Sequence, residues 1–173
     1  RVMYAGRITL QKGVQYLLQA FSNLEIPHSE LLLAGEIEPD AKALLTSFEG
    51  TFRHVRYVPQ SELANLYQQA SVFVLPSIQD GFGMVVYEAA ACGLPIIVTG
   101  NVGATIRNGQ DGFIVPIRDA DALARCLTYL YEHPRQRAAM GQSVCSYVQT
   151  FTWENYHREL VAHYDMIWRD RSR

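Results

Sequence analysis

The sequence predicts an α/β fold, a doubly wound parallel sheet of about six strands with helices on both faces. Three observations support this class. Short apolar runs alternate with longer segments of helical periodicity, the runs lack polar alternation, and Gly and Pro mark the joints between them. Parallel strands that are covered on both faces produce this pattern. With 173 residues, 49% of them apolar, the chain is expected to form one domain over residues 1–173.

The elements follow in order along the chain. The expected strands occupy residues 2–5, 31–34, 55–58, 72–75, 96–99 and 113–115, and the expected helices occupy residues 12–21, 39–48, 61–70, 83–92, 119–132, 134–148 and 152–168. Ser61, Asp119 and Thr152 suit N-caps, and Pro134 suits a first helical turn. Gly93, with a proline two residues later, ends the helix before it.

Composition argues against several classes of protein. A net charge of −2 and a pI near 6.2 give no basic footprint for nucleic acid. No apolar run approaches the roughly 20 residues of a membrane span, and no leader opens the chain, so we expect a cytoplasmic location. The three cysteines form no Cys-x-x-Cys pair, which favours buried reduced thiols over a disulfide or a zinc site.

Residues 76–95, PSIQDGFGMVVYEAAACGLP, join a strand to a helix through a glycine loop. Gly81 and Gly83 let the backbone approach a ligand, and the free amides where the helix begins face any phosphate placed there. Glu88 lies about 7 to 8 Å further along the helix axis, a distance that suits the hydroxyls of a ribose. Its carboxylate can accept two hydroxyl hydrogen bonds. The segment therefore predicts a site for a nucleoside diphosphate.

Asp80 precedes this helix in the loop. In a sugar nucleotide, the sugar lies on the side of the diphosphate away from the ribose. We expect the Asp80 carboxylate to face this sugar. The alternative is that Asp80 caps the helix. A structural role for Glu88 is likewise left open.

Residues 2–13, VMYAGRITLQKG, give a strand, a glycine turn, Arg7, and then Lys12 and Gly13 at the start of a helix. Arginine can bind a phosphate bidentately and lysine supplies a compact charge, which suits a diphosphate leaving group. The spacing differs from that of a Walker loop, because Val14 stands where the hydroxyl that binds magnesium would be needed. Both loops follow parallel strands, so both are expected at the carboxyl edge of the sheet.

Together the two motifs resemble those of the retaining glycosyltransferases of family 4, also called glycosyl transferases group 1. The family combines Gly-Arg-x-x-x-x-Lys-Gly with Pro-Ser-x-x-Glu-Gly-Phe-Gly, an acid-seven-acid spacing, and Glu-Ala-x-Ala-x-Gly-x-Pro. The matching residues are Gly6, Arg7, Lys12, Gly13, Pro76, Ser77, Asp80, Gly81, Phe82, Gly83, Glu88, Ala89, Ala91, Gly93 and Pro95. Asp80 stands where the family usually has Glu, and this shortens the reach of the carboxylate by one methylene.

The resemblance implies a set of residues that contact the donor: Gly6, Arg7, Lys12, Val58, Asp80, Gly81, Phe82, Gly83, Met84, Val85 and Glu88. Of these, it gives Arg7, Lys12 and Asp80 catalytic roles in stabilising the leaving group and the sugar. It implies no metal and no other cofactor. Two departures concern Arg56, where the family usually has glycine beside the nucleotide base, and residues 100–106, which lack the usual acid.

The resemblance also implies a larger protein. This chain would be the C-terminal, donor-binding half of a two-domain GT-B enzyme, with an acceptor domain upstream of Arg1. The donor would be a UDP- or GDP-linked hexose, and the acceptor a hydroxyl of a glycan or lipid-linked molecule, as in polysaccharide or lipopolysaccharide biosynthesis. We expect this half alone to be inactive, and a peripheral association of the whole protein with the inner face of the membrane is left open.

The sequence is also compatible with functions other than sugar transfer. A GT-B nucleotide-sugar epimerase or a non-catalytic sugar-nucleotide-binding scaffold is left open, whereas a phosphorylase would need a lysine for pyridoxal phosphate beyond Lys12 and Lys42. Asp119 and Asp121 imitate an acid-x-acid metal pair, but they open a helix, and capping explains them better.

The last predicted helix has an aromatic and aliphatic stripe at steps of three and four. Packing of this stripe on its own domain is favoured over contact with a missing domain or a membrane.

Overall fold

The computed structural model describes residues 1–171, which contain six strands and seven helices. The strands are β1 (Val2–Ala5), β2 (Leu31–Ala34), β3 (Phe52–Val55), β4 (Val72–Leu75), β5 (Ile96–Thr99) and β6 (Gly112–Val115). The helices are α1 (Val14–Ser22), α2 (Pro39–Ser47), α3 (Gln60–Gln68), α4 (Met84–Ala91), α5 (Ala120–Glu132), α6 (Pro134–Val148) and α7 (Trp153–Arg171). All strands pair in parallel, in the order β3-β2-β1-β4-β5-β6. The predicted fold class is confirmed.

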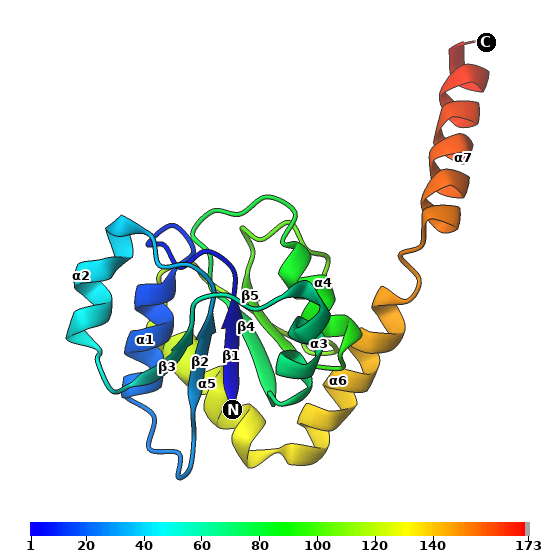
Figure 1. Cartoon of the computed structure of the whole chain (residues 1–173). Helices are drawn as coiled ribbons and strands as arrows, with labels where there is room; N and C mark the ends of the chain where they lie inside the picture. Colours follow the sequence, from blue (N-terminus) through cyan, green and yellow to red (C-terminus); the bar gives the residue numbers. More distant parts are fainter. Residues whose placement is uncertain (172–173) are drawn as a thin grey trace.

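The strand order reverses between β1 and β4. The chain first moves outward from β1 to β3 and then returns to place β4 on the other side of β1. Helices α1 and α2 lie on one side of the sheet and α3 and α4 on the other (Figure 1). Ligands of such sheets bind outside the carboxyl ends of the strands at the point of reversal. This is where the two predicted ligand loops emerge, because they follow β1 and β4.

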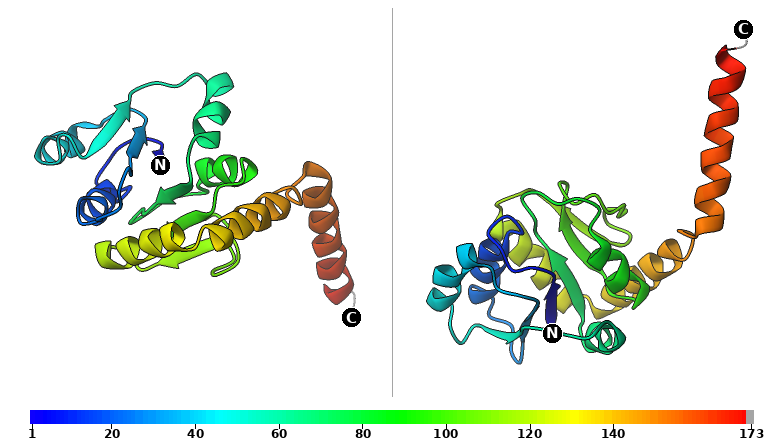
Figure 2. Two further views of the ribbon diagram at one scale, coloured as in Figure 1. Left: turned by 90° about the horizontal axis from the view of Figure 1, so that it is seen from below. Right: turned by 45° about the horizontal axis from the view of Figure 1, so that its top comes forward.

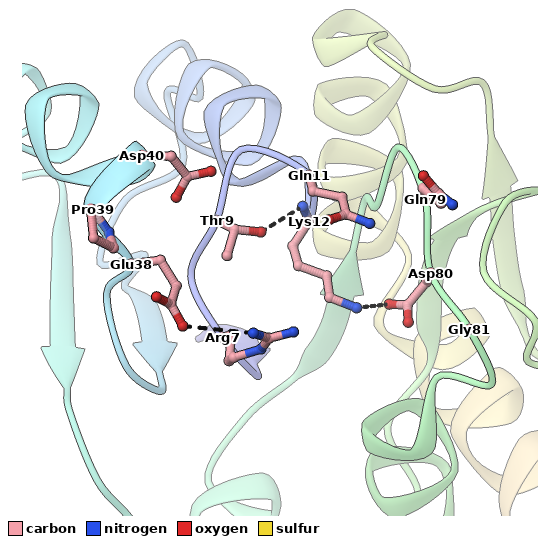
Figure 3. A pocket seen from close by; sticks show the side chains of 10 residues that line it. All are labelled: Arg7, Thr9, Gln11, Lys12, Glu38, Pro39, Asp40, Gln79, Asp80 and Gly81. Carbon is pink, nitrogen blue, oxygen red and sulfur yellow. Dashed lines mark hydrogen bonds and ion pairs between the residues drawn. The ribbon is translucent and has the colours of Figure 1, made fainter.

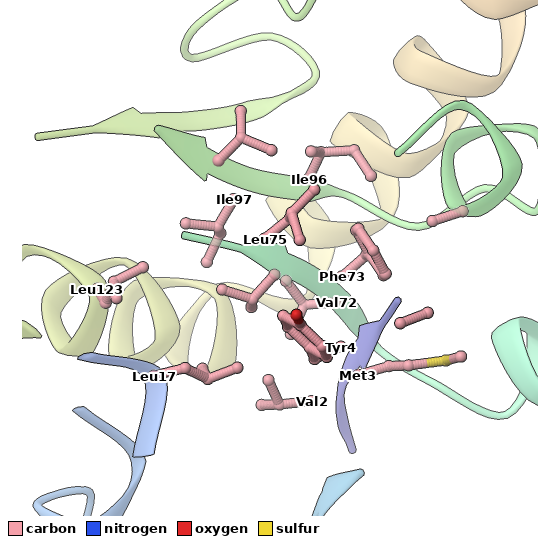
Figure 4. Packing of buried hydrophobic residues seen from close by; sticks show 14 of the residues in the cluster. Val2, Met3, Tyr4, Leu17, Val72, Phe73, Leu75, Ile96, Ile97 and Leu123 are labelled. Atoms are coloured by element: carbon pink, nitrogen blue, oxygen red, sulfur yellow. The ribbon is translucent and has the colours of Figure 1, made fainter. Parts of the chain in front are cut away.

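All four residues of β1, β2, β4 and β5 are buried. Figure 4 shows side chains of β1, β4 and β5 packed together in the core. Met3 and Phe73 are fully buried where β1 pairs with β4. Helix α1 packs against α5 on one face, and α4 packs against α6 on the other. Burial on both faces explains why these four strands appear in the sequence as continuous apolar runs.

The predicted strand at residues 55–58 is wrong, because β3 comprises Phe52–Val55. Strand β3 is the edge of the sheet, and its register places Phe52 beside Leu31 and Val55 beside Ala34. Arg53 is exposed within it, since one side of an edge strand meets solvent. The strand therefore lacks the apolar run that marks the central strands.

Two of the predicted N-caps are confirmed. Asp119 accepts a hydrogen bond from the backbone amide of Ala122 at 2.7 Å, and Thr152 accepts one from Asn155 at 3.1 Å. Pro134 opens α6 as expected. Ser61 is not a cap, because α3 begins at Gln60 after Pro59. The three cysteines are free but half-buried instead of fully buried.

Helix α7 leaves the α/β body and extends away from it (Figures 1 and 2). The predicted stripe is exposed, with exposed fractions of 77% for Trp153 and 64% for Tyr164. The favoured expectation that this stripe packs on its own domain is therefore wrong. Across residues 1–171, no helix is both long enough and apolar enough to cross a membrane.

Candidate functional site

The loops after β1 and β4 end in the same way. Gly13 precedes α1 with φ 72° and Gly83 precedes α4 with φ 71°, both in the left-handed region. Neither residue offers a side chain to cap its helix, so the first amides of α1 and α4 have no side-chain acceptor. The two helix starts without a side-chain cap thus follow β1 and β4, the strands between which the strand order reverses, and uncapped helix starts favour anions.

The two loops are joined through their backbones. The amide of Ile78 donates to the carbonyl of Gln11 at 2.9 Å. A Cβ added to Gly13 would lie 1.9 Å from the carbonyl oxygen of Pro76, so only glycine permits this approach. The contact fixes the residue after Lys12 against the start of the second motif.

Lys12 and Asp80 meet across this junction (Figure 3). The distance from Lys12 Nζ to Asp80 Oδ2 is 2.6 Å, and the Asp80 side chain is only 9% exposed. Ser77, which is fully buried, donates its hydroxyl to the same Oδ2 atom at 3.1 Å. Helix capping by Asp80 is excluded, since α4 begins after Gly83 without a side-chain cap. The carboxylate instead holds the lysine of the other motif.

Arg7 projects from the first loop with its side chain 74% exposed, and its Nη1 atom lies 3.8 Å from Glu38 Oε1. Its backbone carbonyl accepts a hydrogen bond from the hydroxyl of buried Tyr4 at 2.7 Å. Burial, followed by the nearby charge of Asp80, raises the pKa of Tyr4, so this hydroxyl stays protonated as a donor. The backbone of Arg7 is therefore fixed while its guanidinium points toward open space.

The first of two cavities at this edge has a volume of about 670 Å³ and lies between the loops (Figure 3). Its walls include Arg7 and Lys12 from one motif and Asp80 and Gly81 from the other. Charged groups of both signs therefore line one space. A diphosphate could meet the two cations there, and a sugar hydroxyl could meet the carboxylate.

The second cavity, of about 890 Å³, extends from Arg7 toward α3 and α4. Glu88 and Val85 of α4 line it together with Arg7 and Val58. Arg7 thus borders both cavities, and it shares the second one with Glu88. The Oε2 atom of Glu88 accepts a hydrogen bond from the hydroxyl of Tyr67 at 3.0 Å.

The far end of the second cavity is formed by residues that follow β2 and β3. Arg56 stands where the family that the motifs resemble usually has glycine, and its Nη2 atom lies 2.9 Å from Glu36 Oε1. Both side chains are largely exposed and line the cavity. Gly35, after β2, allows its backbone to lie close to that of Gly6, after β1. A Cβ added to Gly35 would lie 1.9 Å from the carbonyl oxygen of Gly6.

Residues 100–106 contribute backbone to the site. The amide of Gly103 donates to the carbonyl of Gly81 at 2.9 Å, and an added Cβ would lie 2.3 Å from that oxygen. The amide of Thr105 donates to the hydroxyl of Tyr87 on α4. This segment therefore supports the glycine loop from behind and needs no acid to do so.

The structure gathers most of the predicted site residues. Those that line one or both cavities are Gly6, Arg7, Lys12, Val58, Asp80, Gly81, Val85 and Glu88, and Gly83 begins the adjoining helix. Phe82 and Met84 line neither cavity and are 61% and 59% exposed, with the ring of Phe82 stacked on Tyr87. Ser77 and Tyr67 had no predicted role as partners of Asp80 and Glu88. Several residues that line the cavities also had no predicted role, among them the acids Glu38 and Asp40 of the first cavity and Glu36 of the second.

Asp119 of the acid-x-acid pair is a helix cap, as predicted. Its carboxylate accepts a hydrogen bond from the backbone amide of Ala122 in the first turn of α5. In the part of the chain that the structure describes, no three His, Cys, Asp or Glu side chains are grouped as metal ligands would be.

Comparison with known proteins places these observations in a family. A family model described as glycosyl transferases group 1 matches residues 1–133. A D-inositol 3-phosphate glycosyltransferase of Corynebacterium urealyticum is 32% identical over 176 residues, covering 93% of this chain and 42% of that protein. The chain therefore spans less than half the length of this curated relative.

Solved structures share the fold. A sucrose-phosphate synthase from Thermosynechococcus elongatus superposes with a TM-score of 0.81 at 28% identity, covering 98% of this chain and 45% of that one. The C-terminal domain of a glycosyl transferase group 1 family protein from Francisella tularensis gives 0.78 at 21% identity, covering 87% and 85%. The Anabaena protein HepE in complex with UDP-glucose gives 0.82 at 18% identity, covering 95% and 48%.

Proposed function

Because this chain belongs to the glycosyl transferases group 1 family, we propose that it is the donor-binding domain of a retaining GT-B glycosyltransferase. The donor is a nucleoside-diphosphate sugar that lies across the two cavities. The observation that carries this proposal is that Arg7 borders both of them, between Lys12 and Asp80 on one side and Glu88 on the other. One extended ligand can reach all four side chains.

The phosphate end of the ligand occupies the first cavity. Arg7 and Lys12 bind the diphosphate from the walls of this cavity. The first amides of α4, which have no side-chain acceptor, follow the glycine loop that contributes Gly81 to the same walls. Charge develops on the leaving diphosphate as the glycosidic bond breaks, and prearranged cations and amides stabilise it without metal. Asp80 orients the sugar from the opposite wall.

The nucleoside end occupies the second cavity. Glu88 accepts hydrogen bonds from the ribose hydroxyls, since an ionised carboxylate is an acceptor only. Beyond the ribose, the base lies beside Val58 and Arg56. Apolar side chains such as Val85 and Leu63 provide contact surface between these polar groups.

The acceptor belongs to the larger protein. This chain supplies the donor site, and an additional domain binds the hydroxyl of a glycan or lipid-linked acceptor. The curated relatives are named as transferases to an inositol phosphate, so a polyol or sugar phosphate is a further acceptor to test. On this proposal the whole protein acts in the cytoplasm, and attachment to the inner face of a membrane depends on the acceptor.

Two other functions of the same fold make different predictions. A sugar-nucleotide epimerase would change the donor without an acceptor, and a scaffold would bind the donor without turnover. Release of nucleoside diphosphate by the full-length protein only when acceptor is present distinguishes the transferase from both.

The site is tested by titrating UDP, GDP and ADP into the chain in a calorimeter. One nucleotide is expected to bind, and Lys12→Ala and Glu88→Ala are each expected to weaken it by roughly tenfold, because each removes a charged partner worth about 1.5 kcal/mol. UDP is the first nucleotide to try, since HepE was solved with it.

Two control variants match these changes in chemistry. Lys42→Ala removes an exposed lysine of α2, and Glu132→Ala removes an exposed acid at the end of α5. Neither residue lines the two cavities. Affinity that stays unchanged in both Lys12→Ala and Glu88→Ala would remove the site assignment.

A further inference from the structure

A buried tyrosine lies directly behind Glu88. Tyr67 of α3 is 1% exposed, and its hydroxyl donates to Glu88 Oε2 at 3.0 Å. Its ring packs edge-on against Phe73 of β4, with centroids 5.8 Å apart and planes at 68°. The ring is thus held by the core while its one polar atom reaches the wall of the second cavity.

Packing of the ring does not explain why this residue carries a hydroxyl. A phenylalanine would fill the same space, and burying a hydroxyl is unfavourable unless it forms a hydrogen bond. Glu88 is the partner that satisfies it. Burial and then the charge of Glu88 raise the pKa of Tyr67, so the group remains a protonated donor over the range in which enzymes work.

Glu88 needs such a partner if it is to act on a ligand. Its side chain is half-buried on the second turn of α4, and several rotamers are open to an unrestrained glutamate. A hydrogen bond to Oε2 fixes one oxygen of the carboxylate. The remaining acceptor positions can then face the cavity in one orientation.

We infer that Tyr67 is a positioning residue for donor binding: it holds Glu88 so that the carboxylate receives the ribose hydroxyls of a nucleoside diphosphate. This inference rests on the proposed function, because it requires Glu88 to bind ribose. It assigns a role to a residue that touches no ligand and acts through another side chain. Charge-assisted hydrogen bonds depend strongly on geometry, so a freed carboxylate loses part of its contact with the ribose.

The test compares two ligands in two proteins. UDP, or whichever of GDP and ADP binds in its place, and the 2′,3′-dideoxy analogue of the same nucleotide are titrated into the unchanged chain and into Tyr67→Phe. The unchanged chain is expected to prefer the ribonucleotide by roughly tenfold, the ratio that corresponds to one hydrogen bond to a charged group. In Tyr67→Phe this preference is expected to fall to about threefold or less, as it does when half of that free energy is lost.

The dideoxy analogue separates positioning from a structural effect. Its affinity is expected to be the same in both proteins, because it cannot bond to Glu88. A general disturbance of the site would weaken both ligands alike. Tyr16→Phe is the matched control, since Tyr16 is a half-buried tyrosine of α1 that lines neither cavity.

Glu88→Asp provides a second variant that leaves Tyr67 in place. The shorter side chain cannot both accept from Tyr67 and reach the cavity, so the preference for the ribonucleotide is expected to fall here as well. A full preference retained in either Tyr67→Phe or Glu88→Asp overturns the inference but leaves the donor site standing. A chain that shows no preference before mutation, or binds none of the nucleotides, overturns the ribose role of Glu88 and this inference with it.

Discussion

Asp80 and Glu88 belong to one motif but have different surroundings. Asp80 lies against a lysine at 2.6 Å and a buried hydroxyl, so its negative charge is balanced within the protein. The Glu88 carboxylate accepts a hydrogen bond from the neutral hydroxyl of Tyr67. Seven residues of sequence thus separate a carboxylate that is part of an ion pair from one whose partner is a neutral hydroxyl.

Because of these different surroundings, one motif can serve two ends of a ligand. In the free protein, Lys12 is already neutralised by Asp80, so an incoming diphosphate must compete for it. On the proposed function, Glu88 accepts ribose hydroxyl groups without having to leave an ion pair. We therefore expect changes at the two acids to alter nucleotide affinity in opposite directions.

The largest effect is expected on stability. It comes from Gly13→Ala, which would move Lys12 away from Asp80. The left-handed φ of 72° disfavours alanine, and its Cβ would lie 1.9 Å from the Pro76 carbonyl oxygen. The strain of such a φ costs about 1 to 2 kcal/mol and the crowding adds about 1 to 3 kcal/mol, so the free energy of unfolding should fall by about 3 kcal/mol. Urea denaturation measures it.

Gly50→Ala is the matched control for this change. Gly50 has φ 86°, but an added Cβ there meets no atom within 4 Å. Only the conformational cost remains, about 1 kcal/mol. Equal losses in the two variants would show that the loops are not held by the close approach of Gly13 to Pro76.

An intermediate effect is expected from Asp80→Asn, which keeps the shape of the side chain and removes its charge. Lys12 becomes free and the carboxylate no longer repels the diphosphate, so UDP should bind about fivefold more tightly, a gain of about 1 kcal/mol. Glu88→Gln removes a charged acceptor and should weaken UDP by about the same factor. Calorimetry at low and high salt measures both, and salt should reduce the gain in Asp80→Asn.

Opposite signs would establish the difference between the two acids. A loss of UDP affinity in Asp80→Asn as large as that in Glu88→Gln would contradict it, because both carboxylates would then contact the nucleotide. In the full-length protein, Asp80→Asn is also expected to lose sugar transfer despite its tighter binding of UDP, since no carboxylate orients the sugar.

The sequence allowed one of these acids to be placed better than the other. The meeting of Lys12 with the second motif could be expected, because both loops follow parallel strands and therefore share one edge of the sheet. Tyr67 could not be expected as the partner of Glu88. An aromatic residue in an amphipathic helix gives the same signal whether its hydroxyl bonds to solvent, backbone or a functional acid.

Edges and ends of the fold were the hardest to predict. Strand β3 pairs on one side only, and exposed Arg53 interrupts the apolar run that marks the central strands. The stripe on α7 has the periodicity of a packed helix, yet periodicity shows which side chains share a face and not what covers them. Whether a stripe is covered depends on contacts distant in sequence, which no local pattern contains.

The smallest effect on UDP affinity is expected from Arg56→Ala, at the nucleoside end of the site. Arg56 borders the cavity that contains Glu88, and its side chain is 78% exposed beside Glu36, which is also largely exposed. Exposed ion pairs contribute about 0 to 1 kcal/mol, so UDP affinity should change by less than about fivefold and stability hardly at all. Calorimetry and thermal unfolding measure the two quantities. A loss of tenfold or more would mean that Arg56 leaves Glu36 to bind the nucleotide, so that a side chain contacts the ligand where the family usually has glycine.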